Sequence, residues 1–437
     1  MLFANLPEEL LWHIFTTYFE RDSHTLALLA TLNKRFHRIT TPILYSHVTL
    51  SLDNGDESRN VRRFIMSVFS SPYLAQCVRS LELNELSWAT HQSLSRRRRE
   101  LVARMMTGNI LGRPDRLDMF KLVTVVRRLP LSDKHKHKWC AELQEVAPSL
   151  DALVALILVF LSSLEKLESN CHWGPIRRNV RDDGVKIQAT GLESGRETSS
   201  ITHLELRYCN IDMHSLQTIL KYCRSVRTFI FHRDWDPRFR VRLSGASITE
   251  ALRPLWETLE NVALSFEPCI YLHQEGEIHP LDFSHFSTLT NIYVAAGYLI
   301  HDPEDFDIYD FSKTDHFEDE RELLNAPLHD RLPESLEVLR ITGFSTPQQL
   351  EFLIEDCCGM LQHRSRFPRL RELSIEVEFG DVDVGFNMRT LQEEAHRADV
   401  VFRKIDITDF SNHDALPTPA GCDWGMNGEF RWSTKLV

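Results

Sequence analysis

The sequence predicts an α/β protein in which a short helical segment is followed by a long array with a parallel sheet and outer helices. Two observations predict this class. Three short amphipathic segments fill the first fifty residues, and after them one short apolar pattern of the β-strand kind recurs along the chain. At 437 residues the chain exceeds the usual size of one hydrophobic core, so we expect several domains or an extended repeat array.

The chain opens with MLFANLPEELLWHIFTTYF, which predicts an amphipathic helix that begins at Leu6 or Pro7. Proline is favoured in the first turn of a helix, and the acidic Glu8 and Glu9 suit the positive end of the helix dipole. Two rows of apolar residues, each spaced four apart, run along this helix: Leu6, Leu10 and Ile14, and beside them Leu11, Phe15 and Phe19. An apolar stripe this wide must be buried against something else.

The stretch RDSHTLALLATLNKRFHRITTPILYSHVTL, residues 21–50, predicts two more helices. Ser23 or Thr25 is placed to cap the first of them, and the second carries Phe36 and Ile39 and should end or bend near Pro42. Three short helices bury too little surface to be stable alone. Their remaining apolar faces should therefore dock on a partner or on the rest of the chain.

The segments LPEELLWHIF, LALLATLNKRF and TPILYSHVTL, in this order, resemble an F-box of the kind common in fungal F-box proteins, and we interpret residues 1–50 as an F-box domain. The resemblance implies that this domain binds a Skp-type adaptor and, through it, a cullin-RING ubiquitin ligase. The adaptor-binding positions that the resemblance assigns are Leu6, Pro7, Leu10, Leu11, Ile14, Phe15, Leu29, Leu32, Lys34 and Phe36. The chain departs from the family at Leu32-Asn33, where valine followed by serine or cysteine is more common. The alternative is that these helices only cap the domain that follows.

The recurring pattern is an apolar residue followed by two more at the third and fifth positions after it. It occurs in VRSLEL, ITHLEL, VRTFIF, LENVAL, LTNIYV, LEVLRI and LRELSI, more weakly in FRKIDI with Phe402, Ile405 and Ile407, and in degenerate form in SLEKLES. This pattern resembles the strand of leucine-rich repeats, in which alternate leucines enter a stacked core. Helical stretches such as LQTILKYCRS and ALRPLWET precede several copies, which predicts a parallel sheet with helices on its outer side.

Successive copies from Ile201 onward begin 25 to 47 residues apart, so residues 51–437 are predicted to form an irregular leucine-rich-repeat solenoid. The pattern lapses in a helical segment at about 95–165. Residues 181–200 are polar and contain glycine, which is typical of an exposed loop. The acidic insert 301–322 is interpreted as a solvated loop, or alternatively as a contact site for a basic partner.

Side chains between the leucines of each strand should line the open inner face of such an array. The substrate-binding residues predicted there are His203, Glu205, Arg207, Thr228, Ile230, His232, Tyr293 and Arg340. The face is mixed in charge with a few apolar anchors, which favours a protein or peptide as its ligand. The alternative is that loops, including 301–322, recognise the substrate.

The sequence offers little catalytic chemistry. The residues His135, His137 and Cys140 have metal-ligand chemistry, but no second ligand cluster follows, and a helix turns residues two apart away from each other. Cys357 and Cys358 are adjacent, which favours a buried cysteine in a repeat helix. No P-loop, GxSxG, HExxH or Rossmann glycine pattern occurs. We therefore predict a protein that is not an enzyme and has no cofactor and no metal.

The net charge of −12 argues against nucleic acid as a partner, because a phosphate-binding surface needs a basic field. The longest apolar run, LDALVALILVFL, is too short to span a bilayer, so we expect no membrane association. Nine unpatterned cysteines and the lack of a signal-peptide pattern predict a cytoplasmic or nuclear protein.

The two resemblances together imply a substrate-recognition subunit of a Skp-cullin-F-box E3 ubiquitin ligase, which binds an unknown protein substrate through its repeats. The alternative is a leucine-rich-repeat scaffold, or an F-box protein that binds its adaptor outside any ubiquitin ligase.

Overall fold

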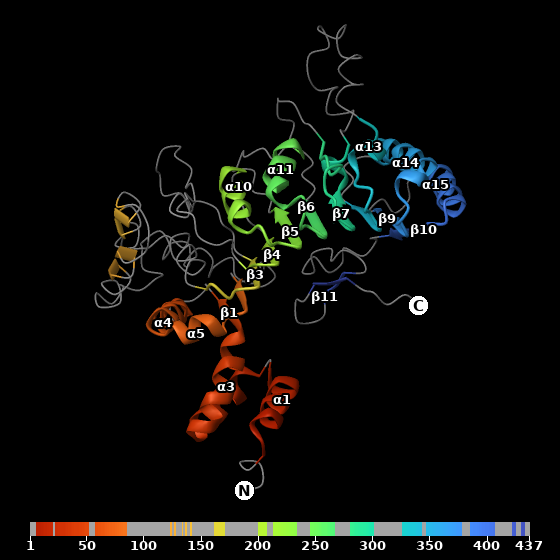
Figure 1. Cartoon of the computed structure of the whole chain (residues 1–437). Helices are drawn as coiled ribbons and strands as arrows, with labels where there is room; N and C mark the ends of the chain where they lie inside the picture. Colours follow the sequence, from red (N-terminus) through yellow and green to blue (C-terminus); the bar gives the residue numbers. More distant parts are fainter. Residues whose placement is uncertain are drawn as a thin grey trace, which may run out of the picture. The chain divides into compact units, whose positions relative to one another are not determined.

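The computed structural model (Figure 1) describes residues 6–20, 22–51, 57–84, scattered helical residues between 123 and 141, and residues 161–170, 200–207, 213–233, 245–266, 280–300, 326–342, 347–377, 385–406, 422–424 and 430–432. The chain forms two compact units. One comprises Met1–Cys209 with Lys221–Val226, and the other comprises Asn210–Leu220 with Arg227–Val437.

Three helices begin the first unit: α1 (Glu8–Phe19), α2 (Ser23–Leu32) and α3 (Lys34–Ser46). Pro7 is the N-cap of α1, so this helix begins one or two residues later than predicted. The helices share one small core, whose buried members are Leu11, Phe15, Leu26, Phe36, Ile39 and Ile43. The three helices expected in this segment are therefore present.

The ends of α2 and α3 differ from the prediction. Asp22, and neither Ser23 nor Thr25, caps α2: its carboxylate accepts a hydrogen bond from the Thr25 amide at 2.9 Å. The helix does not end near Pro42, which was one of the two predicted outcomes, because α3 continues through Pro42 to Ser46. Proline removes one backbone hydrogen bond, and the burial of Ile39 and Ile43 on either side of it outweighs that loss.

The rest of the described first unit consists of α4 (Glu57–Ser70), α5 (Pro72–Cys77) and the strands β1 (His47–Ser51), β2 (Ser80–Asn84), β3 (Lys166–Asn170) and β4 (His203–Arg207). The four strands pair in parallel and in chain order. Their register aligns one row of buried or partly buried apolar residues, Val48, Leu81, Leu167 and Leu204. Strand β1 directly follows α3, and neither this strand nor its pairing with β2 was predicted.

The second unit contains the strands β5 (Thr228–Arg233), β6 (Asn261–Phe266), β7 (Asn291–Ala295), β8 (Val338–Thr342), β9 (Glu372–Val377) and β10 (Val401–Asp406). Its helices are α11 (Gly245–Leu252), α13 (Leu328–Arg331), α14 (Pro347–Gln362) and α15 (Gly385–Arg397), and short 3-10 turns occupy 253–255, 296–298 and 364–366. Most of α10 (Met213–Tyr222) also belongs to this unit, and its last two residues belong to the first unit. The strands again pair in parallel and in chain order, and Figure 1 shows α11, α13, α14 and α15 on one side of them. A short antiparallel pair, β11 (Cys422–Trp424) and β12 (Phe430–Trp432), completes the described elements.

The leucine positions of the recurring pattern form continuous rows across β5 to β9. The register aligns Phe229, Val262, Ile292, Leu339 and Leu373, all of them fully buried. All nine copies of the pattern contribute a strand to one of the two units. The predicted α/β class, with parallel strands and accompanying helices, is therefore confirmed.

The last copy has a different register from the one predicted. Phe402, and not Ile405, pairs with Leu373, so Ile405 lies beside Glu376. The reason lies in the turn before β10, where Asp399 has a positive φ of 54° and ends α15. The amides of Asp399 and Val400 bond back to the carbonyls of His396 and Ala395, as in a Schellman motif, and the strand begins directly afterwards.

Several predicted segments lie outside the described residues: most of the helical segment at about 95–165, residues 181–199 and the insert 301–322. Within the part of the chain that the structure describes, no helix combines the length and the apolar character needed to cross a membrane.

Candidate functional site

The three N-terminal helices are held together by aromatic packing. The ring of Phe15 contacts Phe36 edge-on at 5.8 Å between centroids, and Phe19 similarly at 6.4 Å. Asn33 caps α3, since its side chain accepts a hydrogen bond from the Phe36 amide at 2.8 Å. These contacts fix the directions of α1 and α3, and with them the side chains that point outward.

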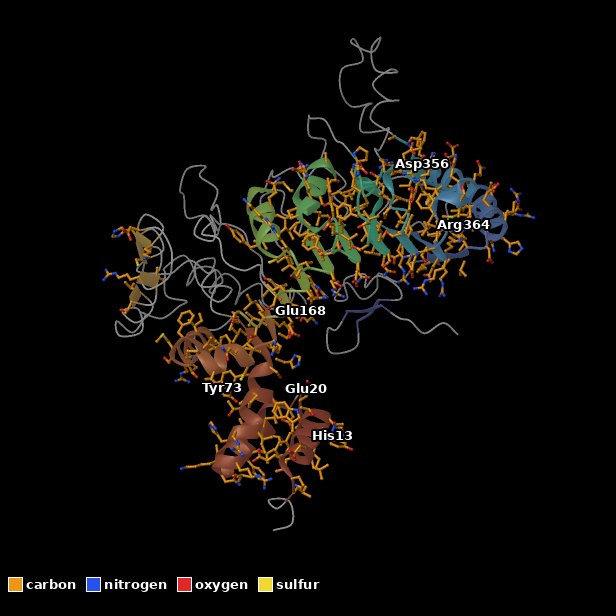
Figure 2. All side chains as sticks on the ribbon, viewed as in Figure 1. His13, Glu20, Tyr73, Glu168, Asp356 and Arg364 are labelled. Carbon is orange, nitrogen blue, oxygen red and sulfur yellow. The ribbon has the colours of Figure 1, made fainter. Side chains whose placement is uncertain are left out.

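Polar contacts also tie the start of α1 to α3. The guanidinium of Arg35 donates to the Leu6 carbonyl, and Arg38 donates to the Glu8 carboxylate. The Arg35 side chain also lies 3.5 Å from Glu8. His13, labelled in Figure 2, is exposed on the side of α1 turned away from α3.

Exposed apolar side chains are concentrated on α1 and α2. The structure describes eight large apolar side chains as exposed, and five of them belong to these two helices: Leu10, Trp12, Tyr18, Leu28 and Leu32. Leu10 and Tyr18 lie on the same side of α1 as the half-buried Ile14, because residues four apart share a helix face. Leu28 and Leu32 form a similar row on α2. We call these two rows the apolar surface of α1 and α2.

The ten adaptor-binding residues predicted from the resemblance fall into three groups. Leu11, Phe15 and Phe36 are buried in the core of the three helices, and Leu6, Ile14 and Leu29 are partly buried against it. Pro7, Leu10, Leu32 and Lys34 are exposed. In this structure the first group holds the helices in place, and the last group is available to a partner directly.

Sequence reasoning missed three exposed apolar residues on these helices, Trp12, Tyr18 and Leu28. Tyr18 continues the spacing of Leu10 and Ile14 by one more step of four, which was a usable signal. Trp12 and Leu28 offered none, since exposure on a short helix depends on which of its faces the neighbouring helices cover.

The inner face of β3 and β4 carries a charged network. Register places Glu168 opposite Glu205, and His203 lies two residues before Glu205 on the same face (Figure 2, where Glu168 is labelled). The Lys166 ammonium lies 2.9 Å from Oε1 of Glu168, and the Arg207 guanidinium donates to Oε1 of Glu205. Glu205 is only 1 % exposed, so its charge depends on these neighbours.

Burial, together with the nearby positive charges of Lys166 and Arg207, lowers the pKa of His203 to about 4, while the Glu168 carboxylate opposes the change. At neutral pH the imidazole is therefore uncharged, although it stands beside two carboxylates.

The inner face of the second unit is less open than predicted. Ile230, Ala263 and Tyr293 align in register on β5, β6 and β7 and form a small buried cluster. The Tyr293 hydroxyl donates to Glu376 at 3.2 Å. Arg340, next in this row, is also buried and donates to Glu372 at 3.2 Å.

A second row on this face is a ladder of polar side chains. The Asn261 amide donates to the Thr228 hydroxyl at 3.1 Å, and the Asn291 amide donates to Oδ1 of Asn261 at 2.7 Å. His232 contacts the Ser265 hydroxyl at 2.7 Å.

The prediction that the eight substrate-binding residues lie open is wrong for Glu205, Ile230, Tyr293 and Arg340, which are buried. His203, Arg207, Thr228 and His232 are partly exposed.

The histidine and cysteine residues singled out from the sequence are helical where the structure describes them. His137 and Cys140 lie in a helix and Cys140 is buried, whereas His135 is outside the described residues. Cys357 is buried and Cys358 partly exposed on α14, as expected for a repeat helix. Burial raises the pKa of both thiols, which opposes thiolate chemistry.

No protein-family model and no curated protein matches the chain. The function must therefore be argued from the two surfaces described above.

Proposed function

We propose that the protein is the substrate-recognition subunit of a Skp-cullin-F-box E3 ubiquitin ligase, in which residues 1–50 bind a Skp-type adaptor and the strand-and-helix array binds a protein substrate. The observation that supports this proposal most is the apolar surface of α1 and α2. Large apolar side chains exposed in rows on neighbouring helices are typical of a surface that a partner covers.

The amount of exposed apolar surface supports a partner more than a simple capping role. A helical cap would bury its remaining apolar face against the array that it covers, whereas Leu11, Phe15 and Phe36 belong to the core that the three helices share among themselves. Leu10, Leu32 and Tyr18 lie outside that core and are 50 %, 65 % and 74 % exposed. Covering them in a complex removes apolar area from water, which favours association.

The departure from the family pattern at Asn33 has a physical explanation that is compatible with the proposal. Asn33 caps α3 through its side-chain oxygen, and serine, which is more common there in the family, is an N-cap residue of similar strength. The same helix start is therefore available to either residue.

The test is co-purification of the full chain with a Skp-type adaptor. The variant Leu10→Glu/Leu32→Glu should lose the adaptor, because a carboxylate in a desolvated interface is left unpaired. Phe352→Glu is the matched control: Phe352 is exposed to a similar degree (50 %) on α14 and should leave adaptor recovery unchanged. Full adaptor recovery by a folded double variant would contradict the proposal.

Recruitment of a cullin separates the ligase from the alternatives. An F-box protein acting outside any ligase binds the adaptor without bringing a cullin into the complex, and a scaffold whose helices only cap its array binds neither. The proposal expects adaptor and cullin in one complex with the wild-type chain, and neither with the double variant.

A further inference from the structure

The side chains of Glu168, His203 and Glu205 converge on the inner face of β3 and β4. One ligand atom from each of them, a carboxylate oxygen or an imidazole nitrogen, lies within 4.8 Å of the other two. They come from two neighbouring strands that pair in register, so rigid backbone positions all three. Within the part of the chain that the structure describes, this is the single group of three such residues.

The distance between His203 and Glu205 is compatible with coordination of one ion by both side chains. Nε2 of His203 lies 3.4 Å from Oε2 of Glu205, which is long for an N–H···O hydrogen bond. Two ligands held about 2.1 Å from one tetrahedral zinc ion stand roughly 3.4 Å apart. The three ligand atoms lie within 4.8 Å of one another. The Glu168 side chain must therefore rotate by a small amount to bring its oxygen within coordination distance of the same ion.

The two cations on this face contact particular oxygens of the carboxylates. Lys166 contacts Oε1 of Glu168 and Arg207 contacts Oε1 of Glu205, whereas Oε2 of Glu205 faces Nε2 of His203. Carboxylates directly opposite each other on neighbouring strands repel, and a bound cation reduces that repulsion.

We propose that Glu168, His203 and Glu205 bind one divalent transition-metal ion, with zinc as the expected metal. One imidazole and two carboxylates suit zinc, whereas calcium and magnesium prefer oxygen ligands alone. Three protein ligands leave a coordination position free on the partly exposed side, where the side chain of His203 is 20 % exposed. A carboxylate or imidazole of a bound protein can take that position. The site does not depend on adaptor binding, which the apolar surface of α1 and α2 would provide.

The experiment measures metal binding to the chelator-treated full chain. Zn²⁺ is titrated by calorimetry, and Co²⁺ serves as a spectroscopic probe of nitrogen and oxygen ligands. The wild-type chain should bind one more ion than Glu168→Gln/His203→Gln, or bind it at least tenfold more tightly, and the double variant should lose the corresponding Co²⁺ absorption. His47→Gln is the matched control, because His47 is an exposed strand histidine whose ion-pair partner among the described residues is one carboxylate, Glu20, at 3.2 Å.

A second variant tests the site without removing a ligand. Lys166→Met deletes a cation that competes for Glu168, so it should tighten Zn²⁺ binding several-fold. The proposal is overturned if the double variant binds both ions as the wild type does, or if Lys166→Met weakens binding. Thermal unfolding of each variant without metal checks that the fold is retained.

Discussion

Adjacent leucines on α1 should respond oppositely to truncation. Leu11 is fully buried among the three helices, whereas Leu10 is 50 % exposed on the apolar surface of α1 and α2. We predict that Leu11→Ala destabilises the three-helix segment and that Leu10→Ala leaves it folded but weakens adaptor binding. The pair separates residues that hold the fold from residues that face a partner.

The magnitudes follow from the burial of each side chain. Truncating a fully buried leucine to alanine destabilises a protein by about 2–5 kcal/mol, since the lost contacts leave a cavity. A leucine that is half exposed contributes about half of the roughly 1.5–3 kcal/mol of full burial, so its truncation should lower the free energy of unfolding by about 1.5 kcal/mol or less.

Amide hydrogen exchange of residues 8–46 in the full chain measures this difference locally. Leu11→Ala should accelerate exchange in all three helices by about 30-fold or more, because about 1.4 kcal/mol corresponds to a factor of ten. Leu10→Ala should change it by about twelvefold or less. Equal acceleration by the two variants would refute the assignment of Leu11 to the core and Leu10 to the surface.

Two further predictions concern helix ends. A hydrogen bond from Thr25 lowers the pKa of Asp22, so the ionised cap stabilises α2 above the ordinary aspartate pKa of about 3.9, and this contribution is lost as the pH falls through the lowered value. Asp22→Asn keeps the cap without the charge, so exchange of the α2 amides between pH 2 and 5 should depend less on pH in this variant than in the wild type. Asp399→Gly should stabilise the second unit by about 0.5–1 kcal/mol, because glycine adopts the positive φ of 54° without strain. Urea unfolding measures it, and a destabilised variant would show that the Asp399 side chain holds the turn.

The strand pattern was predictable because it is local. Alternate apolar residues in segments such as VRTFIF and LRELSI are required wherever one face of a strand enters a core, and these segments are strands in the structure. The weak copy FRKIDI was assigned the wrong register, because in the observed register Lys404, which is not apolar, stands opposite Ile375. The turn at Asp399 decided the register by setting where the strand begins.

The helix ends were less predictable because competing residues stand next to each other. Asp22, Ser23 and Thr25 are all good capping residues, and the backbone before α2 places Asp22 where its oxygen meets the Thr25 amide. Pro42 is a helix breaker by propensity alone. Burial of Ile39 and Ile43, which depends on α1 and α2, carried the helix past it.

The sequence by itself determined the class of the fold, the three helices, nine of the ten parallel strands and which positions of each strand repeat are apolar, because these depend on spacing within a few residues. Only the tertiary structure decided which side chains are available to a partner. Leu10 and Leu11 are neighbours of the same type, and packing against Phe36 and Leu26 buries only Leu11. Glu168 and His203 stand 35 residues apart in the sequence, and strand pairing brings their ligand atoms within 4.8 Å. Exposure and convergence depend on contacts between distant segments, and such contacts leave no local pattern in the sequence.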